Sequence, residues 1–399
     1  MIKFLLAPDS FKGSMTAQQV CNAMERGIKI VLPDAECIKV PMADGGEGTV
    51  QSLVDATGGS LYEAEVTGPL GKPVMAQYGI MGDGKTAAIE MASASGIHHV
   101  NMQTRNPLIT TTYGTGELVK VCTDRGIKKI ILGIGGSATN DGGAGFAQAL
   151  GVKFLDVKGN ELPSGGASLT HLHTIDLSSI DKRLSDIDIE VACDVSNPLC
   201  GEMGASSVFG PQKGATPEMV EILDKSLNHY AQIIESQLGK KVKDIPGAGA
   251  AGGFGAGLMT FCNAHLKKGV DIIIEYTHLA EKIKDVDIVF TGEGGIDFQT
   301  QYGKTPYGVA QAAKIQGKSV IAIAGYIGEN INRLYEHGFD AIFGIVPGAM
   351  PLEEALSKGE QNVERTMENI VRLLTIDNGQ LKVENGQLEK KVNTCITRQ

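Results

Sequence analysis

The sequence predicts an α/β protein of two domains: a parallel-sheet, Rossmann-like or flavodoxin-like domain built from both chain ends, and an inserted mixed α+β domain. Three observations support this prediction. The 399 residues are too many for one ordinary core. Apolar strand-like runs alternate with helical patterns near both termini, which is typical of a parallel sheet covered by helices. The middle of the chain instead has short alternating segments and a different rhythm.

The N-terminal part is expected to run strand, helix, strand, helix. An apolar run at residues 2–7 predicts a buried strand, and apolar residues gather near one face of segment 16–32, as in a helix. A second strand is expected at 38–42, followed by an acidic Gly-rich loop and a helix ending near Val54. From 59 to 97, turn-forming Gly-Pro and Asp-Gly pairs indicate antiparallel hairpins.

From residue 116 the sequence again shows patterns typical of helices, and two Gly-rich loops lie among them. The elements expected there are a helix at 116–125, a strand at 130–132, a Gly-rich loop at 133–145, a helix at 146–150, a strand at 187–193, a helix at 216–238 and a second Gly-rich loop at 247–257.

The βα rhythm then resumes to residue 374. The expected elements are a strand at 287–290, a loop at 291–297, a helix at 307–315, a strand at 319–324, a helix at 330–337, a strand at 341–346 and a helix at 352–374. We therefore assign residues 1–60 plus 275–374 to one domain and 61–274 to the insertion; a simple split near 240 is the alternative. Residues 375–399, which contain a seven-residue near-repeat, are expected to form a tail without a catalytic role.

The composition of the chain argues against several classes of function. The net charge of −10 argues against nucleic-acid binding, which requires clusters of Lys and Arg. The seven cysteines form no C-x-x-C pair, so reduced thiols in a reducing compartment are expected. The first residues do not form a signal peptide and no run of 18 apolar residues occurs, so we expect a cytoplasmic protein without a membrane partner.

The loop at 133–145 lies between a predicted strand and a predicted helix. Glycines let backbone N–H groups approach a bound anion closely, and the start of a helix adds partial positive charge. A loop that only had to turn would rarely carry as many polar side chains as this one does, namely Ser137, Thr139, Asn140 and Asp141. We therefore expect a phosphate or carboxylate cradle; the alternative is a connection without a ligand.

Acidic side chains follow four of the apolar strands. They are Asp9, Asp44 with Glu47, Asp194, and Glu293 with Asp297. In open α/β sheets ligands bind outside the carboxyl ends of the strands, so these side chains are expected to converge on one cleft, although any one alone would more often be a cap or turn former. Carboxylates beside anion loops suit phosphoryl transfer, because they hold Mg²⁺ and accept the proton of an attacking hydroxyl.

Two lysines lie in the same loops. Lys12 and Lys304 are each expected to meet a phosphate or a substrate carboxylate, with a solvated surface lysine as the alternative.

Two further motifs are expected to be coincidental. Residues 79–86 fit the Walker A pattern, but they lie where a hairpin turn is predicted. Residues 133–138, with Asp156 downstream, resemble a dinucleotide fingerprint, but a polar segment intervenes before the helix. His171 and His173 have no partner at metal-ligand spacing.

Several long motifs occur in an order that closely resembles the type I glycerate kinase family over residues 1–374. They are residues 7–13, 41–49, 135–143, 208–215, 249–253 and 291–294, with Asp297, Gln299 and Thr300. The resemblance implies ATP-dependent phosphorylation of D-glycerate with Mg²⁺, at the 2-hydroxyl to give 2-phosphoglycerate rather than 3-phosphoglycerate. It also implies a two-domain architecture unrelated to P-loop kinases.

With this resemblance, candidate roles are assigned as hypotheses. Asp194 is the leading general base, with Asp44 and Asp141 as rivals, and Glu293 and Asp297 are the leading Mg²⁺ ligands, directly or through water. The candidates for binding glycerate or phosphate are Asp9, Ser10, Lys12, Gly135, Gly136, Ser137, Thr139, Asn140, Asn197, Gly252, Gly253 and Lys304.

Two other functions remain open at this stage. An NAD-linked hydroxy-acid oxidoreductase would use residues 133–138 and Asp156, and a non-catalytic anion sensor would use the same cleft without turnover. The expected partners are glycerate and a nucleotide, with a homo-oligomer left open.

Overall fold

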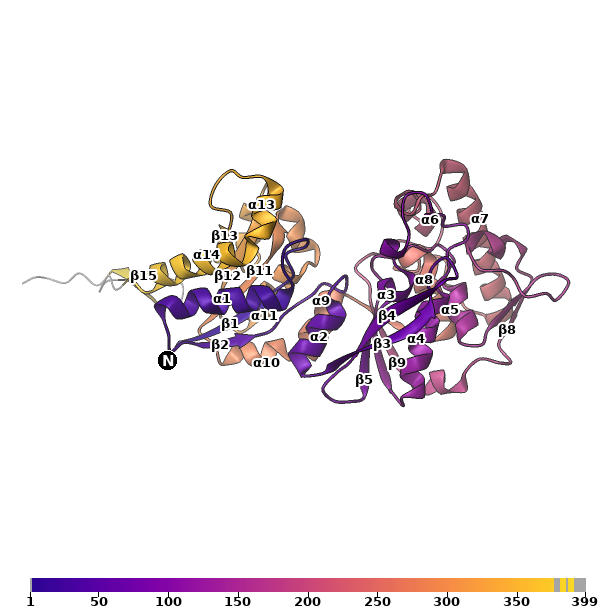
Figure 1. Ribbon diagram of the computed structural model, residues 1–399, viewed down its shortest axis with the longest axis horizontal. Coiled ribbons are helices and arrows are strands. Elements are labelled where there is room, and N and C mark those ends of the chain that lie inside the picture. The colour runs from indigo at the N-terminus through magenta and orange to yellow at the C-terminus, as the bar shows by residue number, and fades with distance from the viewer. Residues whose placement is uncertain (1, 377–380, 385–386, 391–399) are drawn as a thin grey trace, which may run out of the picture.

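Two sheets organise the chain, and each forms the centre of one lobe in Figure 1. The computed structural model describes residues 2–376, 381–384 and 387–390. The first sheet is wholly parallel, with strand order β13-β12-β11-β1-β2. Its strands are β1 (Lys3–Pro8), β2 (Glu36–Lys39), β11 (Ile288–Ile296), β12 (Ser319–Ile327) and β13 (Ala341–Gly344).

Strand β1 shows how this sheet is covered on both faces. Phe4 and Leu6 point into a cluster with helices α1 and α14, whereas Leu5 and Ala7 point into a cluster on the opposite face, because successive side chains of a strand alternate. The helices of this lobe are α1 (Ala17–Val31), α10 (Leu279–Lys284), α11 (Thr305–Ile315), α12 (Asn332–Tyr335), α13 (Leu352–Ser357) and α14 (Gly359–Leu374).

The second sheet is mixed, with strand order β10-β9-β6-β5-β4-β3. Strands β10, β9, β6 and β5 are parallel, and β5, β4 and β3 are antiparallel. Its strands are β3 (Ser60–Thr67), β4 (Pro73–Ile80), β5 (Thr86–Glu90), β6 (Lys129–Gly133), β9 (Asp188–Ala192) and β10 (His265–Lys267). The predicted combination of a parallel sheet with a mixed one is therefore confirmed.

Helices cover the outer face of this second sheet. They are α3 (Met91–Ser95), α4 (Tyr113–Asp124), α5 (Ala144–Ala149), α6 (Ala205–Phe209), α7 (Pro217–Leu238) and α8 (Ala250–Phe261), beside a small antiparallel pair, β7 (Lys153–Leu155) and β8 (Thr174–Asp176). Ile130 and Leu132 of β6 belong to the hydrophobic cluster formed with these helices, and Ile131 between them belongs to the cluster on the opposite face of the sheet.

Helices α2 (Thr49–Thr57) and α9 (Gly269–Tyr276) lie between the two sheets (Figure 1). One hydrophobic cluster contains Leu5 of the first sheet, Leu53 of α2, Ile272 of α9 and Ile131 of the second sheet. The lobes therefore share a continuous apolar core through these two helices, rather than meeting only at flexible linkers.

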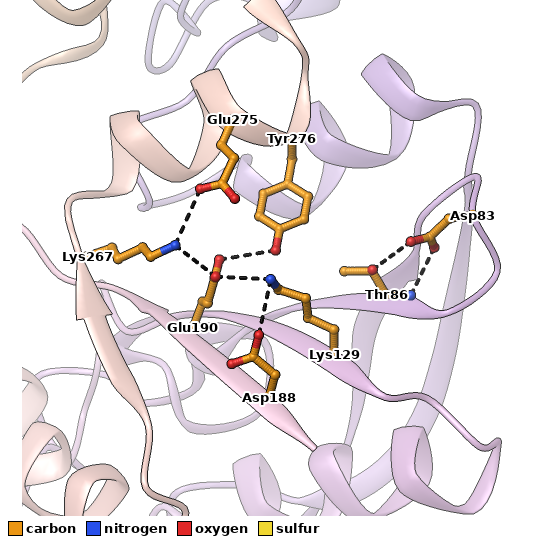
Figure 2. Close-up of polar contacts among 8 residues, drawn as sticks. All are labelled: Asp83, Thr86, Lys129, Asp188, Glu190, Lys267, Glu275 and Tyr276. Carbon is orange, nitrogen blue, oxygen red and sulfur yellow. Dashed lines mark hydrogen bonds and ion pairs between the residues drawn. The ribbon is translucent and has the colours of Figure 1, made fainter. Parts of the chain in front are cut away.

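An ionic network fixes α9 on the second sheet (Figure 2). Glu190 on β9 is 5% exposed and accepts from Lys129 at 3.0 Å, Lys267 at 2.8 Å and the Tyr276 hydroxyl at 3.1 Å. Burial alone would raise the pKa of Glu190, but the bonds from Lys267 and Lys129 outweigh it and hold the pKa below its usual value. Tyr276 belongs to α9, so this network joins the helix to the sheet.

The hairpin predicted over the Walker-like sequence is confirmed, since β4 and β5 pair antiparallel on either side of that turn. Three other predicted elements differ from the structure. Strand β11 continues through the predicted loop at 291–297, because its Gly-rich end pairs with β12 as far as Ile296↔Ile327. The helix predicted at 352–374 is interrupted at Lys358, between α13 and α14. The second Gly-rich loop overlaps the start of α8, where Ala251, Gly252 and Gly253 have left-handed backbone angles, so regular helix begins after them.

The first sheet takes strands from residues 3–39 and 288–344, and the second from 60–267. The domain bounds 1–60 plus 275–374 and 61–274 stay a proposal. Helices α2 and α9, which lie near these bounds, share one hydrophobic cluster with residues of both sheets. In the tail, β14 (Leu381–Glu384) pairs with β15 (Gln387–Lys390), and the remaining residues after Ile376 lie outside the described part of the chain, including much of the near-repeat.

Candidate active site

The first sheet has a topological switch point between β1 and β11. Strand β2 lies on one side of this pair and β12 on the other, so the connecting helices diverge and leave a crevice at the carboxyl ends of the strands. A cavity of about 820 Å³, here called the first cavity, lies at this edge. Asp9 and Ser10 follow β1, Glu293 lies on β11, and Lys304 precedes α11; all four line the cavity.

A second cavity of about 660 Å³ lies at the carboxyl ends of β6 and β9 in the other lobe. Its lining includes Asp194 and residues 135–137. Lys12 and Asp44 line both cavities, so the two form one crevice that joins the lobes. The structure therefore brings Asp9, Asp44, Asp194 and Glu293 together, as the order of strands and acidic loops predicts.

Three carboxylates of this crevice, those of Asp9, Asp194 and Glu293, have raised pKa values. Burial raises the pKa of Asp9 to about 6, with the charge of Asp44 adding to the effect. Burial raises the pKa of Glu293 to about 7 although Lys304 lies 3.4 Å away, and it raises the pKa of Asp194 to about 6. Groups that titrate near neutral pH inside a crevice are typical of a catalytic site.

Hydrogen bonds hold the carboxylates of Asp9, Asp194 and Asp44 in place. Asp9 accepts from the Thr305 hydroxyl at 2.6 Å and from its neighbour Ser10 N–H, and Asp194 accepts from Gly269 N–H at 3.0 Å. Asp44 accepts from Gly46 N–H at 3.0 Å. Each carboxylate keeps an oxygen lone pair available, so each can meet a cation or a proton.

The donor set fits a Mg²⁺ ion. Mg²⁺ is usually held by one or two carboxylates plus substrate phosphates, and Asp9 and Glu293 line the same cavity. Among the described residues no group of three His, Cys, Asp or Glu side chains could hold a metal by itself. Asp297 does not line either cavity; its carboxylate caps the 3₁₀ turn Phe298–Tyr302 by accepting from Gln299 N–H at 2.8 Å.

Asp141 is fully buried and lies outside the lining of both cavities. It accepts from Thr112 N–H at 2.8 Å and hydroxyl at 2.9 Å, from Gly143 N–H at 3.1 Å and from Gly145 N–H at 3.3 Å. With its oxygens occupied in this way, Asp141 holds the loop in shape, and the structure does not place it beside a reacting group as the sequence-based role required.

Of the Gly-rich loop, only its first part faces the crevice. Gly135, Gly136 and Ser137 line the second cavity, whereas Thr139 and Asn140 are fully buried. Gly252 and Gly253 are also buried and contact this loop instead of the cavity, since Gly142 N–H donates to Gly252 O at 3.0 Å.

Gly252 is required at its position for two reasons. Its φ of +73° is disfavoured for other residues, and a Cβ there would overlap the Thr139 carbonyl oxygen. The two Gly-rich loops thus approach each other backbone to backbone. Asn197, another predicted binding residue, donates to Met203 O at 2.8 Å and lines neither cavity.

Sequence reasoning missed two basic residues of the second cavity. Lys213 and Arg105 both line it, and Lys213 is only 2% exposed. Lys213 belongs to the motif at residues 208–215, but the sequence does not show that it is buried, because lysines are mostly exposed. Burial lowers the pKa of Lys213 to about 7, with the charge of Asp141 acting in the opposite direction.

The dinucleotide interpretation lacks its structural context. After residues 133–138 the chain continues as a loop, and α5 begins only at Ala144, so the direct entry into a helix that the fingerprint requires is missing.

Comparisons with known proteins identify the family of this chain. A family model described as the glycerate kinase family matches residues 4–375. The chain belongs to the glycerate kinase family. A glycerate kinase of Haemophilus influenzae is 55% identical over 373 residues, covering 94% of this chain and 99% of the relative. A glycerate 2-kinase of Escherichia coli K12 is 51% identical over 375 residues, covering 94% and 98%.

A solved structure shares this fold. The crystal structure from Salmonella typhimurium LT2, provisionally named glycerate kinase 2, has a TM-score of 0.86 and 51% identity, covering 94% of this chain and 98% of that one. Membership of the glycerate kinase family makes the protein an enzyme of the kinase class. Within the described residues, no helix is both long and apolar enough to span a bilayer.

Proposed function

We propose that this glycerate kinase family member transfers the γ-phosphoryl group of ATP to D-glycerate, with Mg²⁺, to give 2-phosphoglycerate. The observation that carries the proposal is the meeting of two cavities at Lys12 and Asp44. A phosphoryl donor and an acceptor need separate sites that open onto each other, because the phosphoryl group must pass directly between them.

The nucleotide is assigned to the first cavity. Part of its lining is apolar and offers a surface for a nucleobase, formed by Ile327, Val346, Met350, Leu352 and Leu356. Lys12 and Lys304 also line this cavity, and cationic groups suit phosphates. The acceptor is then assigned to the second cavity, with its hydroxyl facing the shared wall.

In the proposed reaction, Asp194 accepts the proton of the acceptor hydroxyl as that oxygen bonds to the γ-phosphorus and the bond to ADP breaks. A pKa of about 6 leaves the Asp194 carboxylate ionised near neutral pH while keeping it basic enough to take the proton. Lys12 would counter the charge of the passing phosphoryl group. Mg²⁺, when held by Glu293 with Asp9, would neutralise phosphate charge; these two replace the Glu293 and Asp297 pair expected from sequence.

A ³¹P NMR assay tests the proposal. We expect ATP, Mg²⁺ and D-glycerate to yield ADP and the resonance of 2-phosphoglycerate, which is resolved from that of 3-phosphoglycerate. Formation of the 3-phosphate would correct the position of transfer, and binding of D-glycerate without any turnover would contradict the kinase reaction. The same sample with EDTA replacing Mg²⁺ is expected to lose activity.

A further inference from the structure

The start of the loop after β6 presents backbone N–H groups that face the second cavity. Gly136 has a φ of +70°, and in the described part of the chain none of the N–H groups of residues 135–137 donates to a protein acceptor. Gly135 and Gly136 are exposed to the second cavity. Successive N–H groups around a left-handed residue form a concave nest that binds anions.

Lys213 adds a buried cation to this nest. Its ammonium donates to the Ser137 hydroxyl at 2.8 Å and to Thr139 O at 2.6 Å. An ammonium group has three N–H donors, so one remains beside the cavity. Neither partner is charged, and the nearby Asp141 carboxylate is already bonded to N–H and hydroxyl groups. A buried lysine without an ionic partner is costly, and a bound anion would compensate for that cost.

Arg105 lies at the same end of the cavity. Its Nη1 donates to Gln212 O at 3.4 Å, next to Lys213, and its Nε is buried without a hydrogen-bond partner among the described residues. Arg105, Lys213 and the nest therefore belong to the lining of one cavity, and each has a donor that no protein group uses among the described residues. Two cationic groups with adjacent N–H donors match the two oxygens of a carboxylate.

We infer that Lys213, Arg105 and the N–H groups of residues 135–137 bind the carboxylate of the acceptor and so select a hydroxy acid over a plain alcohol. This inference rests on the proposed function. Lys213 and Arg105 line the second cavity and not the first, whereas a phosphoryl group in transfer must lie at the wall that the cavities share. The group that these residues hold therefore belongs to the acceptor.

The test compares Lys213→Met and Arg105→Gln with the unmodified enzyme. We expect the KM for D-glycerate to rise about 10- to 100-fold in each variant, as loss of a charge-assisted hydrogen bond would cause, while the KM for ATP changes less than about threefold. The preference for D-glycerate over glycerol, measured as a ratio of kcat/KM values, is expected to fall by a similar factor. Calorimetric titration with D-glycerate should show the same weakening.

Lys240→Met is the matched control for folding. Lys240 also donates to two carbonyl oxygens, those of Met259 and Thr260, but lies outside both cavities, so its loss should leave both KM values unchanged. If Lys213→Met were too unstable, Arg105→Gln alone would decide the question, because Arg105 is partly exposed.

A rise in the KM for ATP with an unchanged KM for D-glycerate would overturn the inference and assign these residues to phosphate. Unchanged affinities for both substrates in folded Arg105→Gln and Lys213→Met would overturn it as well. If the unmodified enzyme phosphorylated no glycerate, the proposed function would fail, and the calorimetric titration would still decide whether these residues bind a carboxylate.

Discussion

At the scale of the residue, Asp194 carries the proposed proton transfer. We expect Asp194→Asn to lower kcat at saturating ATP and D-glycerate by about 10²- to 10⁴-fold, because the amide cannot accept a proton. The amide oxygen can still accept from Gly269 N–H, so the fold should be kept. Steady-state kinetics measure the effect, and a fall smaller than about tenfold would exclude Asp194 as the base.

Asp271→Asn serves as its control, since Asp271 is an exposed neighbour on α9 that lines neither cavity. With the pKa of Asp194 at about 6, kcat/KM of the unmodified enzyme should decline as the pH falls below about 6, where the carboxylate becomes protonated.

Asp9 provides a second test, through stability. Burial raises its pKa to about 6, whereas an unfolded Asp titrates near 3.8. The folded state therefore binds the proton more tightly, and its stability falls as the pH rises from about 4 to 6. We expect Asp9→Asn to raise the free energy of unfolding by about 1–3 kcal/mol at pH 7.5 and to change it little near pH 4.

Urea denaturation at the two pH values measures this difference, with the exposed Asp34→Asn as control. If the free energy of unfolding of Asp9→Asn changed equally at both pH values, the effect would not come from the charge of Asp9. The Asp9→Asn variant should lose activity as it gains stability, since the charged groups of functional sites often destabilise the folded state.

Sequence reasoning found the acidic residues of the site but not their individual tasks. The strand-end position of Asp9, Asp44, Asp194 and Glu293 predicted that they converge, because carboxyl ends of parallel strands share an edge. It could not distinguish Asp141, since two of the four hydrogen bonds that its carboxylate accepts come from Thr112, 29 residues away. Lys213 was missed because its burial depends on contacts with residues 74 and 76 positions earlier.

At the scale of the element, the contact between the two Gly-rich loops determines the shape of the second cavity. We expect Gly252→Ala to destabilise the protein by about 1–3 kcal/mol more than Gly239→Ala, measured by thermal or urea unfolding. Gly239 has a similar φ of +70°, but a Cβ there would meet nothing within 4 Å, so that variant reports only backbone strain of about 1 kcal/mol. Equal losses of stability in Gly252→Ala and Gly239→Ala would show that the two Gly-rich loops are not in close contact.

Elements with strong periodicity were predictable, and Gly-rich ones were not. Residues 16–32 predicted a helix, and α1 covers Ala17–Val31 with Thr16 as its N-cap. The end of β11 looked like a loop because glycine has little intrinsic preference for strands, yet pairing with β12 makes it one. At the break at Lys358, the Ser14 hydroxyl donates to Leu356 O at 2.6 Å, a contact across the fold that the sequence does not show. The glycine that follows, Gly359, is the local signal for a helix end there.

At the scale of the whole molecule, the crevice has one wall on each lobe, so substrates can draw the lobes together. We expect ADP and D-glycerate together to reduce the radius of gyration measured by small-angle X-ray scattering below the value with either ligand alone. An unchanged radius would indicate that water is excluded without movement of the lobes. The shared core through α2 and α9 would then act as a rigid joint.

The position of β1 in the middle of the first sheet bears on synthesis. Strand β1 pairs with β2 on one side, but its other partner, β11, begins only at Ile288, so a ribosome must make the entire second sheet before β1 can gain its second neighbour. During that interval the nascent chain holds an apolar strand with one open edge, while the later-made insertion can already fold. The first sheet can therefore be completed only after the insertion has been made, and a chain that ended before Ile288 would lack the strand that carries Glu293.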